Sequence, residues 1–327
     1  MLVSAIVVNL DGRDLLLDCL ASLKVALAQV DGPTEIVVVD NGSTDDSVAH
    51  VRERFESARI VALDRNIGFA GGVNVGLVAS SGEWLLLLNN DATIEPAAVT
   101  ALLCAAEDRP TVGSLAAQMR FARTGALNSA GLGVDRLGVA FDRHIGEPPA
   151  SAGSDVVEVF GASAGAALVR RTMLDEIGRF DDSFFMYLDD VDVAWRARMA
   201  GWTCIYVPGA IVHHHHSASS VHNSSFKHLH VGRNRVRLLA KHAPPGQLLR
   251  YGAAIVVHDL AYVVVAGFGD RTLAPLRGRL QGVRRWPQDR ADGRATRRAV
   301  ELAAVQGPCR ALARRRSARR GTALRSS

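Results

Sequence analysis

Short apolar runs rich in valine, isoleucine and leucine alternate with helical patterns along the first hundred residues. Four such runs predict buried strands, over residues 2–9, 35–40, 58–63 and 84–88. Apolar residues recur at helical spacing over 13–29, and a second helix is expected over 47–56. Because parallel strands need helical crossovers, this alternation predicts an α/β fold with a doubly wound, mostly parallel sheet and flanking helices.

Polar residues stand where three of these strands end. Asp40, the pair Asp64 and Arg65, and the run from Asn89 to Asp91 each follow an apolar run. Ligands of open α/β sheets bind beyond the carboxyl ends of the strands, so these residues are expected at one site. Carboxylate and amide oxygens suit Mg²⁺ or Mn²⁺ carrying a diphosphate. A role for each acid as a helix cap remains the alternative.

These strand ends together predict a site for a nucleoside diphosphate. A carboxylate at Asp40 can accept the N3–H of a pyrimidine, Asp91 can bind the metal, and Arg65 lies nearby in the sequence. The glycine-rich segment 68–76 lets backbone approach a phosphate or lets a helix pack tightly on a strand. Its spacing matches neither the dinucleotide-binding motif nor the P-loop.

The segment 119–157 is rich in glycine and predicts long loops or a small hairpin over the site. Strand-like composition returns over 159–171, with the small residues Gly161 and Ala162. Small side chains here either leave room for an acceptor or allow close packing. A further strand over 202–208 leads to a run of four histidines, one of which is expected to bind metal through a neutral imidazole.

Two adjacent acids are the strongest candidates for catalysis. Asp189 and Asp190 follow an aromatic run and begin a helix, where the helix dipole favours acids. A carboxylate held beneath aromatic residues and beside another acid has its pKa raised toward neutrality, as a general base requires. Asp192 lies four residues before Arg196 and is expected to form a structural ion pair.

The last quarter of the chain has a different character. Residues 248–268 are largely apolar but interrupted by His258 and Asp259, which predicts a helix packed on the domain or lying in a membrane interface. The arginine-rich tail after it suits an anionic surface or a solvated terminus. We therefore expect a catalytic domain over 1–245 and a helical, basic extension over 246–327.

Composition narrows the class further. A hydrophobic content of 48% and a charged content of 22% are typical of globular proteins, and the net charge is +5. The four cysteines form no CxxC pair, which fits a reducing cytoplasm, and the N-terminus shows no signal-peptide pattern. The arginines are not interleaved with aromatic residues, so no nucleic-acid partner is expected.

As an ordered set, these motifs resemble family 2 glycosyltransferases with the GT-A fold, particularly bacterial rhamnosyltransferases. The similarity spans residues 3–245 and rests on five runs, at 38–45, 66–74, 88–91, 189–192 and 214–219. The resemblance implies that Asp91 and His214 bind Mg²⁺ or Mn²⁺. It also implies that a nucleotide contacts Asn9, Asp40, Asp64, Arg65, Asn66 and Asn90.

The same resemblance implies an inverting transfer of a sugar, rhamnose above others, from dTDP-rhamnose or a UDP-sugar. Asp190 would deprotonate the acceptor hydroxyl with Asp189 beside it. The acceptor, a saccharide or polyprenyl-linked saccharide of the cell envelope, would contact Gly161, Ala162, Trp195 and Arg233. Such an enzyme would be cytoplasmic and peripheral on the inner face of the membrane, with an anionic membrane surface as a partner.

Two departures from the family pattern affect the metal site. The metal motif is often Asp-x-Asp, whereas Asn89 stands at its first position here, which alters the ligand set. Four consecutive histidines match one family position, with His214 favoured and His213 second.

Two other functions remain as alternatives at this point. A nucleotidyltransferase would share the sheet and the metal-diphosphate chemistry, but it would need a glycine-rich, lysine-containing loop that residues 9–13 do not supply. A nucleotide-sugar-binding relative without catalytic activity is the non-enzyme alternative, and the intact pair of Asp189 and Asp190 argues against it.

Overall fold

A ten-stranded sheet forms the centre of the protein in the computed structural model, which describes residues 2–215, 225–293 and 300–305. One half of the sheet is parallel and consists of β3 (Arg59–Ala62), β2 (Thr34–Asp40), β1 (Val3–Asn9) and β4 (Trp84–Leu88). Beyond β4 follow β11 (Ala166–Arg170), β6 (Val112–Phe121), β12 (Thr203–His214) and β10 (Val157–Val159). Strand β11 is antiparallel to both neighbours, while β6 and β12 are parallel. The predicted α/β sheet is therefore confirmed.

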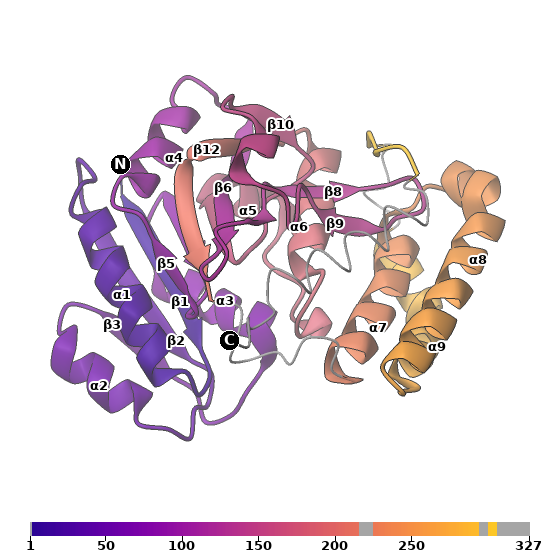
Figure 1. Cartoon of the computed structure of the whole chain (residues 1–327), viewed down its shortest axis with the longest axis horizontal. Coiled ribbons are helices and arrows are strands. Elements are labelled where there is room, and N and C mark those ends of the chain that lie inside the picture. Colours follow the sequence, from indigo (N-terminus) through magenta and orange to yellow (C-terminus); the bar gives the residue numbers. More distant parts are fainter. Residues whose placement is uncertain (1, 216–224, 294–299, 306–327) are drawn as a thin grey trace.

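Helices cover both faces of the sheet because its central strands are buried on both sides (Figure 1). Successive residues of β1 belong to different cores: Ala5 and Val7 pack with α1 (Arg13–Leu27) and α4 (Ala98–Ala106), whereas Ile6 packs with α3 (Gly68–Ala79). The predicted doubly wound arrangement follows from this alternation. Helix α2 (Ser47–Arg54) connects β2 to β3.

The glycines of α3 have a packing role. A Cβ atom on Gly76 would lie 2.4 Å from Cγ2 of Ile6, and one on Gly72 would lie 2.7 Å from Cγ1 of Val8. Any larger side chain would push the helix away from β1. Close helix–strand packing, one of the two interpretations left open above, therefore accounts for these two positions.

The middle of the chain forms the expected hairpin, from β8 (Leu132–Val134) and β9 (Ala140–Asp142). The single strand predicted over 159–171 is wrong, because β10 ends at Val159 and β11 begins at Ala166. Between them, Gly161 forms a bridge with Leu132, which draws the chain out of the main sheet. The strand predicted over 202–208 instead continues to His214, with a register shift between Val207 and Ile211.

Three helices, α7 (Ser225–His242), α8 (Pro245–Gly269) and α9 (Ala274–Asp292), form a layer at one end of the molecule (Figure 1). Helix α9 packs against α7 with backbone in close contact, since a Cβ atom on Gly278 would lie 2.1 Å from the Leu229 carbonyl oxygen. The predicted helical C-terminal region is confirmed. The domain division at 245/246 stays a prediction, and most of the arginine-rich tail lies outside the described residues.

Candidate active site

Three strand ends meet at one edge of the sheet, as the sequence predicts. Asn9 and Asp40 are paired in the β1–β2 register, and Asn9 Nδ2 donates to Asp40 Oδ1 over 3.3 Å. Asn90, just beyond β4, donates from Nδ2 to Asn9 Oδ1 over 2.8 Å. Ser43 donates its backbone N–H to Asp40 Oδ2 over 3.2 Å. These hydrogen bonds connect the buried Asn9 and Asp40 to the half-buried Ser43 and Asn90, and the set forms the floor of the candidate site.

The turn after β3 lies against the turn after β2. Gly42 has φ +84°, and a Cβ atom there would lie 2.7 Å from the Arg65 carbonyl carbon. Asn66 Oδ1 accepts from the Gly68 N–H and from Asn41 Nδ2, over 2.8 and 3.1 Å. The structure thus brings residues 64–66 beside the floor of the site. The side chains of Asp64 and Arg65 are exposed, and the described residues provide no hydrogen bond to either.

The candidate metal ligands are brought together by strand pairing. Strand β5 (Ala92–Ile94) pairs with β12 so that His214 lies opposite Ala92, and His214 Nε2 lies 3.0 Å from Asp91 Oδ1. His213 points to the other side and contacts Glu95 over 2.9 Å. The structure therefore places His214, and not His213, at Asp91. His216 lies outside the described residues.

The chemistry of this pair fits a bound cation. His214 Nδ1 lies 2.9 Å from Asn128 Oδ1 on β7 (Leu127–Ser129). When Nδ1 carries the proton and donates it to this oxygen, Nε2 has a lone pair, and this lone pair faces Asp91. Carboxylate oxygen and imidazole nitrogen are both metal ligands. Among the described residues, no group of three or more histidine, cysteine or acidic side chains is arranged as a metal site. A cation here would take further ligands from a diphosphate or water, as Mg²⁺ does in phosphate-binding sites.

The two candidate catalytic acids are the first residues of α6 (Asp189–Ala200). The chain enters this helix through Phe185, Tyr187 and Leu188, whose φ angles of 66°, 68° and 63° lie in the left-handed region. Residues other than glycine rarely adopt this conformation, and such strain persists only when surrounding contacts enforce it. The entry to α6 is therefore a conformation that the rest of the fold must hold.

Burial raises the pKa of both acids. Asp189 is buried, its Oδ2 has no hydrogen-bond partner among the described residues, and burial with the neighbouring Asp190 raises its pKa well above the usual range. Burial and the charge of Asp142 raise the pKa of Asp190 to about 6. Asp190 also accepts backbone hydrogen bonds from Ala164 and Val191, over 3.3 and 2.8 Å. A carboxyl with this pKa can accept a proton near neutral pH.

Two of the expected acceptor contacts do not reach an open site. Trp195 has no exposed surface, and its ring packs edge-on against Phe160 and parallel to His242. A Cβ atom on Gly161 would lie 2.4 Å from Cβ of Ala194, so this glycine allows α6 to pack closely. The acceptor role predicted for these residues is wrong in this structure. Both support α6 from the side of the protein core.

Ala162 and Arg233 also differ in position. Ala162 lines a small, largely apolar cavity in the protein core together with Asp190, and its acceptor role stays a prediction. Arg233 instead points into the protein and donates from Nη2 to the Phe184 carbonyl oxygen over 2.6 Å. Its predicted acceptor contact is replaced by a contact with the chain that precedes the catalytic acids.

Asn234 was not among the predicted site residues, yet it holds the left-handed segment. Its Nδ2 lies within 3.0 Å of the carbonyl oxygens of Phe184, Met186 and Tyr187. Arg233 Nε donates to Asn234 Oδ1 and fixes the orientation of the amide. No local sequence pattern marks this role, because the partners lie some fifty residues earlier in the chain.

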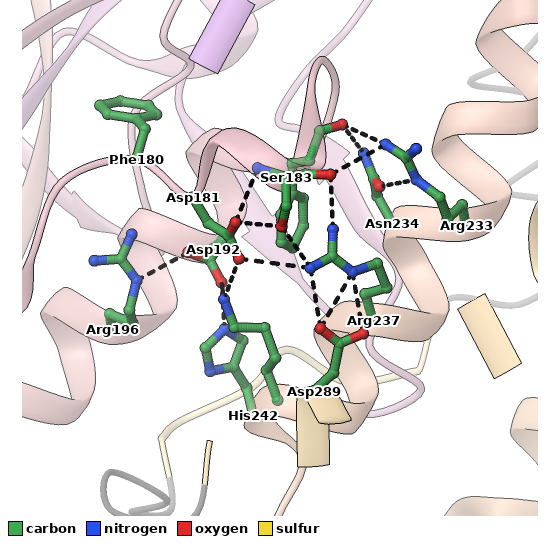
Figure 2. A network of polar contacts seen from close by, with 12 residues as sticks. Phe180, Asp181, Ser183, Asp192, Arg196, Arg233, Asn234, Arg237, His242 and Asp289 are labelled. Carbon is green, nitrogen blue, oxygen red and sulfur yellow. Dashed lines mark hydrogen bonds and ion pairs between the residues drawn. The ribbon is translucent and has the colours of Figure 1, made fainter. Parts of the chain in front are cut away.

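A buried ionic network connects the same segment to α6, α7 and α9 (Figure 2). Asp192 Oδ2 accepts from Arg196 over 2.8 Å, which confirms the predicted ion pair, and Oδ1 contacts His242 and Lys241. Burial alone would raise the pKa of Asp192, but these cations hold it well below its usual range. Next to it, Arg237 contacts Ser183 in η2 (Asp182–Phe184) and Asp289 on α9.

The fold of the chain is the GT-A architecture. Two solved structures share the fold. One is GalNAc-T7 with UDP, GalNAc and Mn²⁺ (TM-score 0.59, 14% identity, 74% of this chain and 48% of that chain). The other is the mannosyltransferase PcManGT from Pyrobaculum calidifontis in complex with GDP-Man and Mn²⁺ (TM-score 0.52, 17% identity, 88% and 85%).

Sequence comparison identifies the family. The model of glycosyl transferase family 2 matches residues 4–178, and the chain belongs to this family. It is 30% identical over 231 residues to the N-acetylglucosaminyl-diphospho-decaprenol L-rhamnosyltransferase of Mycobacterium tuberculosis. That match covers 62% of this chain and 72% of the relative. The resemblance to family 2 enzymes seen in the motifs is thereby confirmed, and the nucleotidyltransferase alternative falls.

Proposed function

We propose that the protein transfers rhamnose, with inversion, from dTDP-rhamnose to a hydroxyl of a lipid-linked saccharide in cell-envelope polysaccharide synthesis. The observation that carries the proposal is that one chain of family 2 contains both the polar cluster of Asn9, Asp40 and Asn90, which suits a pyrimidine nucleotide, and the acid pair Asp189 and Asp190. The relative named above acts, by its name, on N-acetylglucosaminyl-diphospho-decaprenol, which supplies the class of acceptor.

The site supports the following division of roles. Asp40, with Asn9 and Asn90, would bind the pyrimidine, and residues 64–66 would flank the nucleotide. Asp91 and His214 would hold Mg²⁺ or Mn²⁺, which stabilises the charge that develops on the departing nucleoside diphosphate. The solved neighbours with Mn²⁺ support a divalent metal without deciding which one.

Asp190 would act as the general base. Its carboxylate takes the proton of the acceptor hydroxyl while that oxygen attacks the anomeric carbon, and the bond from carbon to the diphosphate oxygen breaks on the opposite face. Asp189 raises the proton affinity of the pair because two neighbouring carboxylates disfavour a second charge. The acid pair at the start of α6 also supports an active enzyme over a relative without catalytic activity, because a base for the acceptor hydroxyl is present.

Donor binding is the first test. The full chain is melted with dTDP, UDP, GDP or NAD, each with and without Mg²⁺ or Mn²⁺. Ligand at about 100 times Kd stabilises the protein by about 2.7 kcal/mol, which corresponds to a Tm rise of several degrees. A metal-dependent rise with dTDP, or with UDP, supports the proposal and identifies the nucleotide of the donor. Equal responses to all four ligands, or none, would contradict the roles of Asp40 and Asp91.

Catalysis and location are tested with the acceptor. We place the enzyme in the cytoplasm, peripheral on the inner face of the membrane, because lipid-linked acceptors present their saccharides at such a surface. Purified protein is incubated with dTDP-rhamnose and N-acetylglucosaminyl-diphospho-lipid, and the product is identified by mass spectrometry. Transfer from UDP-sugars alone would retain the glycosyltransferase and reject rhamnose.

A further inference from the structure

Helix α8 exposes one continuous apolar face. Its most apolar stretch of 18 residues has a mean hydropathy of 1.7, which is enough for a membrane by composition, and only 11% of that stretch is buried in the protein. Asp259 is the only acidic or basic residue between positions 251 and 269 apart from His258. The exposed large side chains on this helix are Leu249, Val256, Val257, Leu260, Val264, Val265 and Phe268. Leu249 is 90% exposed and Phe268 is 83% exposed, so water covers this face unless a partner does.

The opposite face of α8 is fixed to the protein at several points along its length. Asp259 accepts from Arg235 on α7 over 2.8 Å and from Arg279 on α9 over 2.7 Å. Near the end of the helix, His228 of α7 contacts both Tyr262 and Asp270, over 3.2 and 3.0 Å. These contacts recur at helical spacing, so α8 has one anchored face and one apolar face.

This anchoring decides how a membrane would be engaged. A helix that crossed the bilayer would carry Asp259 toward the middle of the hydrocarbon and separate it from Arg235 and Arg279. Both arginines are nearly buried, and charges buried without partners are strongly unfavourable. A helix that lies along the surface keeps every one of these contacts. The structure therefore favours α8 in the plane of the interface.

Helix α9 extends the apolar face and adds positive charge. Leu273, immediately before the helix, and Leu276, Leu280 and Val283 within it are exposed at spacings of three, four and three residues. The arginines at 277, 284 and 285 are also exposed. Of the two acids of α9, Asp289 is buried against Arg237, and Asp292 is exposed as the last residue of the helix. Long cationic side chains beside an apolar strip can place their stems in the apolar layer and their charges among lipid phosphates. Figure 1 shows α8 and α9 side by side at the outer end of the molecule.

We propose that the exposed faces of α8 and α9 form a monotopic docking surface for an anionic phospholipid bilayer. Apolar side chains from both helices enter the acyl boundary, and the arginines of α9 contact the phosphates. The docking surface itself does not depend on which sugar is transferred. Its benefit to catalysis rests on the proposed lipid-linked acceptor, since docking concentrates enzyme and acceptor on one surface.

The test uses two double variants matched in exposure. Val257 and Val264, on the docking surface, are 66% and 54% exposed, and both are changed to glutamate. Val78 on α3 and Val25 on α1, 66% and 53% exposed, are changed to glutamate as the control. Both pairs add the same two charges to exposed helical positions. Circular dichroism and thermal melting verify that each variant folds.

Full-length protein is floated with vesicles of phosphatidylcholine alone or with 30% phosphatidylglycerol. We expect the wild type and the Val25/Val78 variant to bind the anionic vesicles, more weakly at 0.5 M NaCl, and the Val257/Val264 variant to bind at least tenfold more weakly. The proposal is overturned if the wild type binds neither vesicle, binds both equally, or if the two variants bind alike. Equal binding of the variants would assign attachment to another basic segment.

A second outcome separates lipid from a second copy of the chain. Light scattering measures the molar mass of each protein without lipid. A wild-type dimer that becomes monomeric only in the Val257/Val264 variant, with no vesicle binding, would make this face a self-association surface and reject docking. Failure of vesicle binding with normal donor binding leaves the proposed function intact. Loss of donor binding with normal flotation rejects the function and leaves docking intact.

Discussion

Replacing Asp190 by asparagine tests the base assignment with little change in shape. The amide oxygen still accepts a hydrogen bond from the Ala164 or Val191 N–H, but the group no longer accepts a proton near neutral pH. A general base contributes about 10² to 10⁴ in rate, or roughly 3–5 kcal/mol of transition-state stabilisation. We therefore expect turnover to fall by at least a factor of about 100. Donor binding should be unchanged, because Asn9, Asp40 and Asn90 do not contact this residue.

The pH dependence of kcat/KM tests the same assignment independently. The pKa of Asp190 is raised to about 6, so about nine-tenths of the free enzyme carries the base form at pH 7 and about one-tenth at pH 5. The wild-type kcat/KM should therefore fall roughly tenfold between these values, with a slope of one per pH unit below the pKa. The asparagine variant should lose this dependence while retaining its residual rate.

The assay measures release of dTDP from dTDP-rhamnose in the presence of the lipid-linked acceptor, from pH 5 to 8. Asp182→Asn, an exposed acid in η2, serves as the matched control and should behave as the wild type. An Asp190→Asn enzyme within threefold of the wild-type rate would refute the base assignment. A flat wild-type profile between pH 5 and 7 would refute it as well, even if the variant were inactive.

Three further predictions concern other acids. Burial and the neighbouring Asp190 raise the pKa of Asp189 above the ordinary 3.8, so the folded state loses stability as pH rises above 3.8. Asp189→Asn removes this loss. The variant should therefore have a higher Tm than the wild type at pH 7.5 and the same Tm at pH 3.5 in calorimetric scans. Asp192 has a lowered pKa and stabilises the fold above pH 3.8, a contribution that is lost in acid. Asp192→Asn should cost about 3 kcal/mol in urea unfolding at pH 7, because the cations Arg196 and Lys241, 15% and 11% exposed, lose their shared buried carboxylate. Asp91→Asn should weaken Mn²⁺ binding in calorimetry with dTDP by at least about tenfold. Glu95→Gln, whose side chain contacts His213, is the control and should bind Mn²⁺ as the wild type does; equal effects of the two substitutions would contradict the metal role of Asp91.

The cluster of polar side chains at the ends of β1, β2 and β4 could be predicted from sequence, because it depends on the direction of parallel strands. Parallel strands carry their carboxyl ends to one edge, so Asn9, Asp40 and Asn90 had to be neighbours once the strands were identified. The sequence favours His214 over His213 as the metal ligand, and the strand register explains why. The antiparallel register of β5 on β12 places alternate side chains on opposite faces, and only His214 faces Asp91.

The surroundings of Trp195 and Arg233, which were expected to contact the acceptor, depend on packing between distant segments. Trp195 has the size and polarity of an acceptor platform, but α7 places His242 over its ring and closes it off. Arg233 and Asn234 face inward because they donate hydrogen bonds to the Phe184 carbonyl oxygen, at the start of the segment with positive φ angles. The periodicity of a sequence predicts which face of a helix is buried, but it does not predict which distant segment packs on that face. The packing roles of Trp195, Arg233 and Asn234 could therefore not be predicted from the sequence.

The C-terminal helices are part of the structure that forms the active site. Asn234 holds the carbonyl groups before Asp189, and the next residue of α7, Arg235, turns about 100° away to contact Asp259 on the helix proposed to meet the membrane. Arg237 likewise contacts Ser183 on one side and Asp289 of α9 on the other. A chain divided at the predicted boundary would separate Arg235 from Asp259 and Arg237 from Asp289, and it would uncover the face of α7 that α9 covers. Helix α7 thus connects the proposed docking surface on α8 and α9 to the candidate catalytic acids on α6.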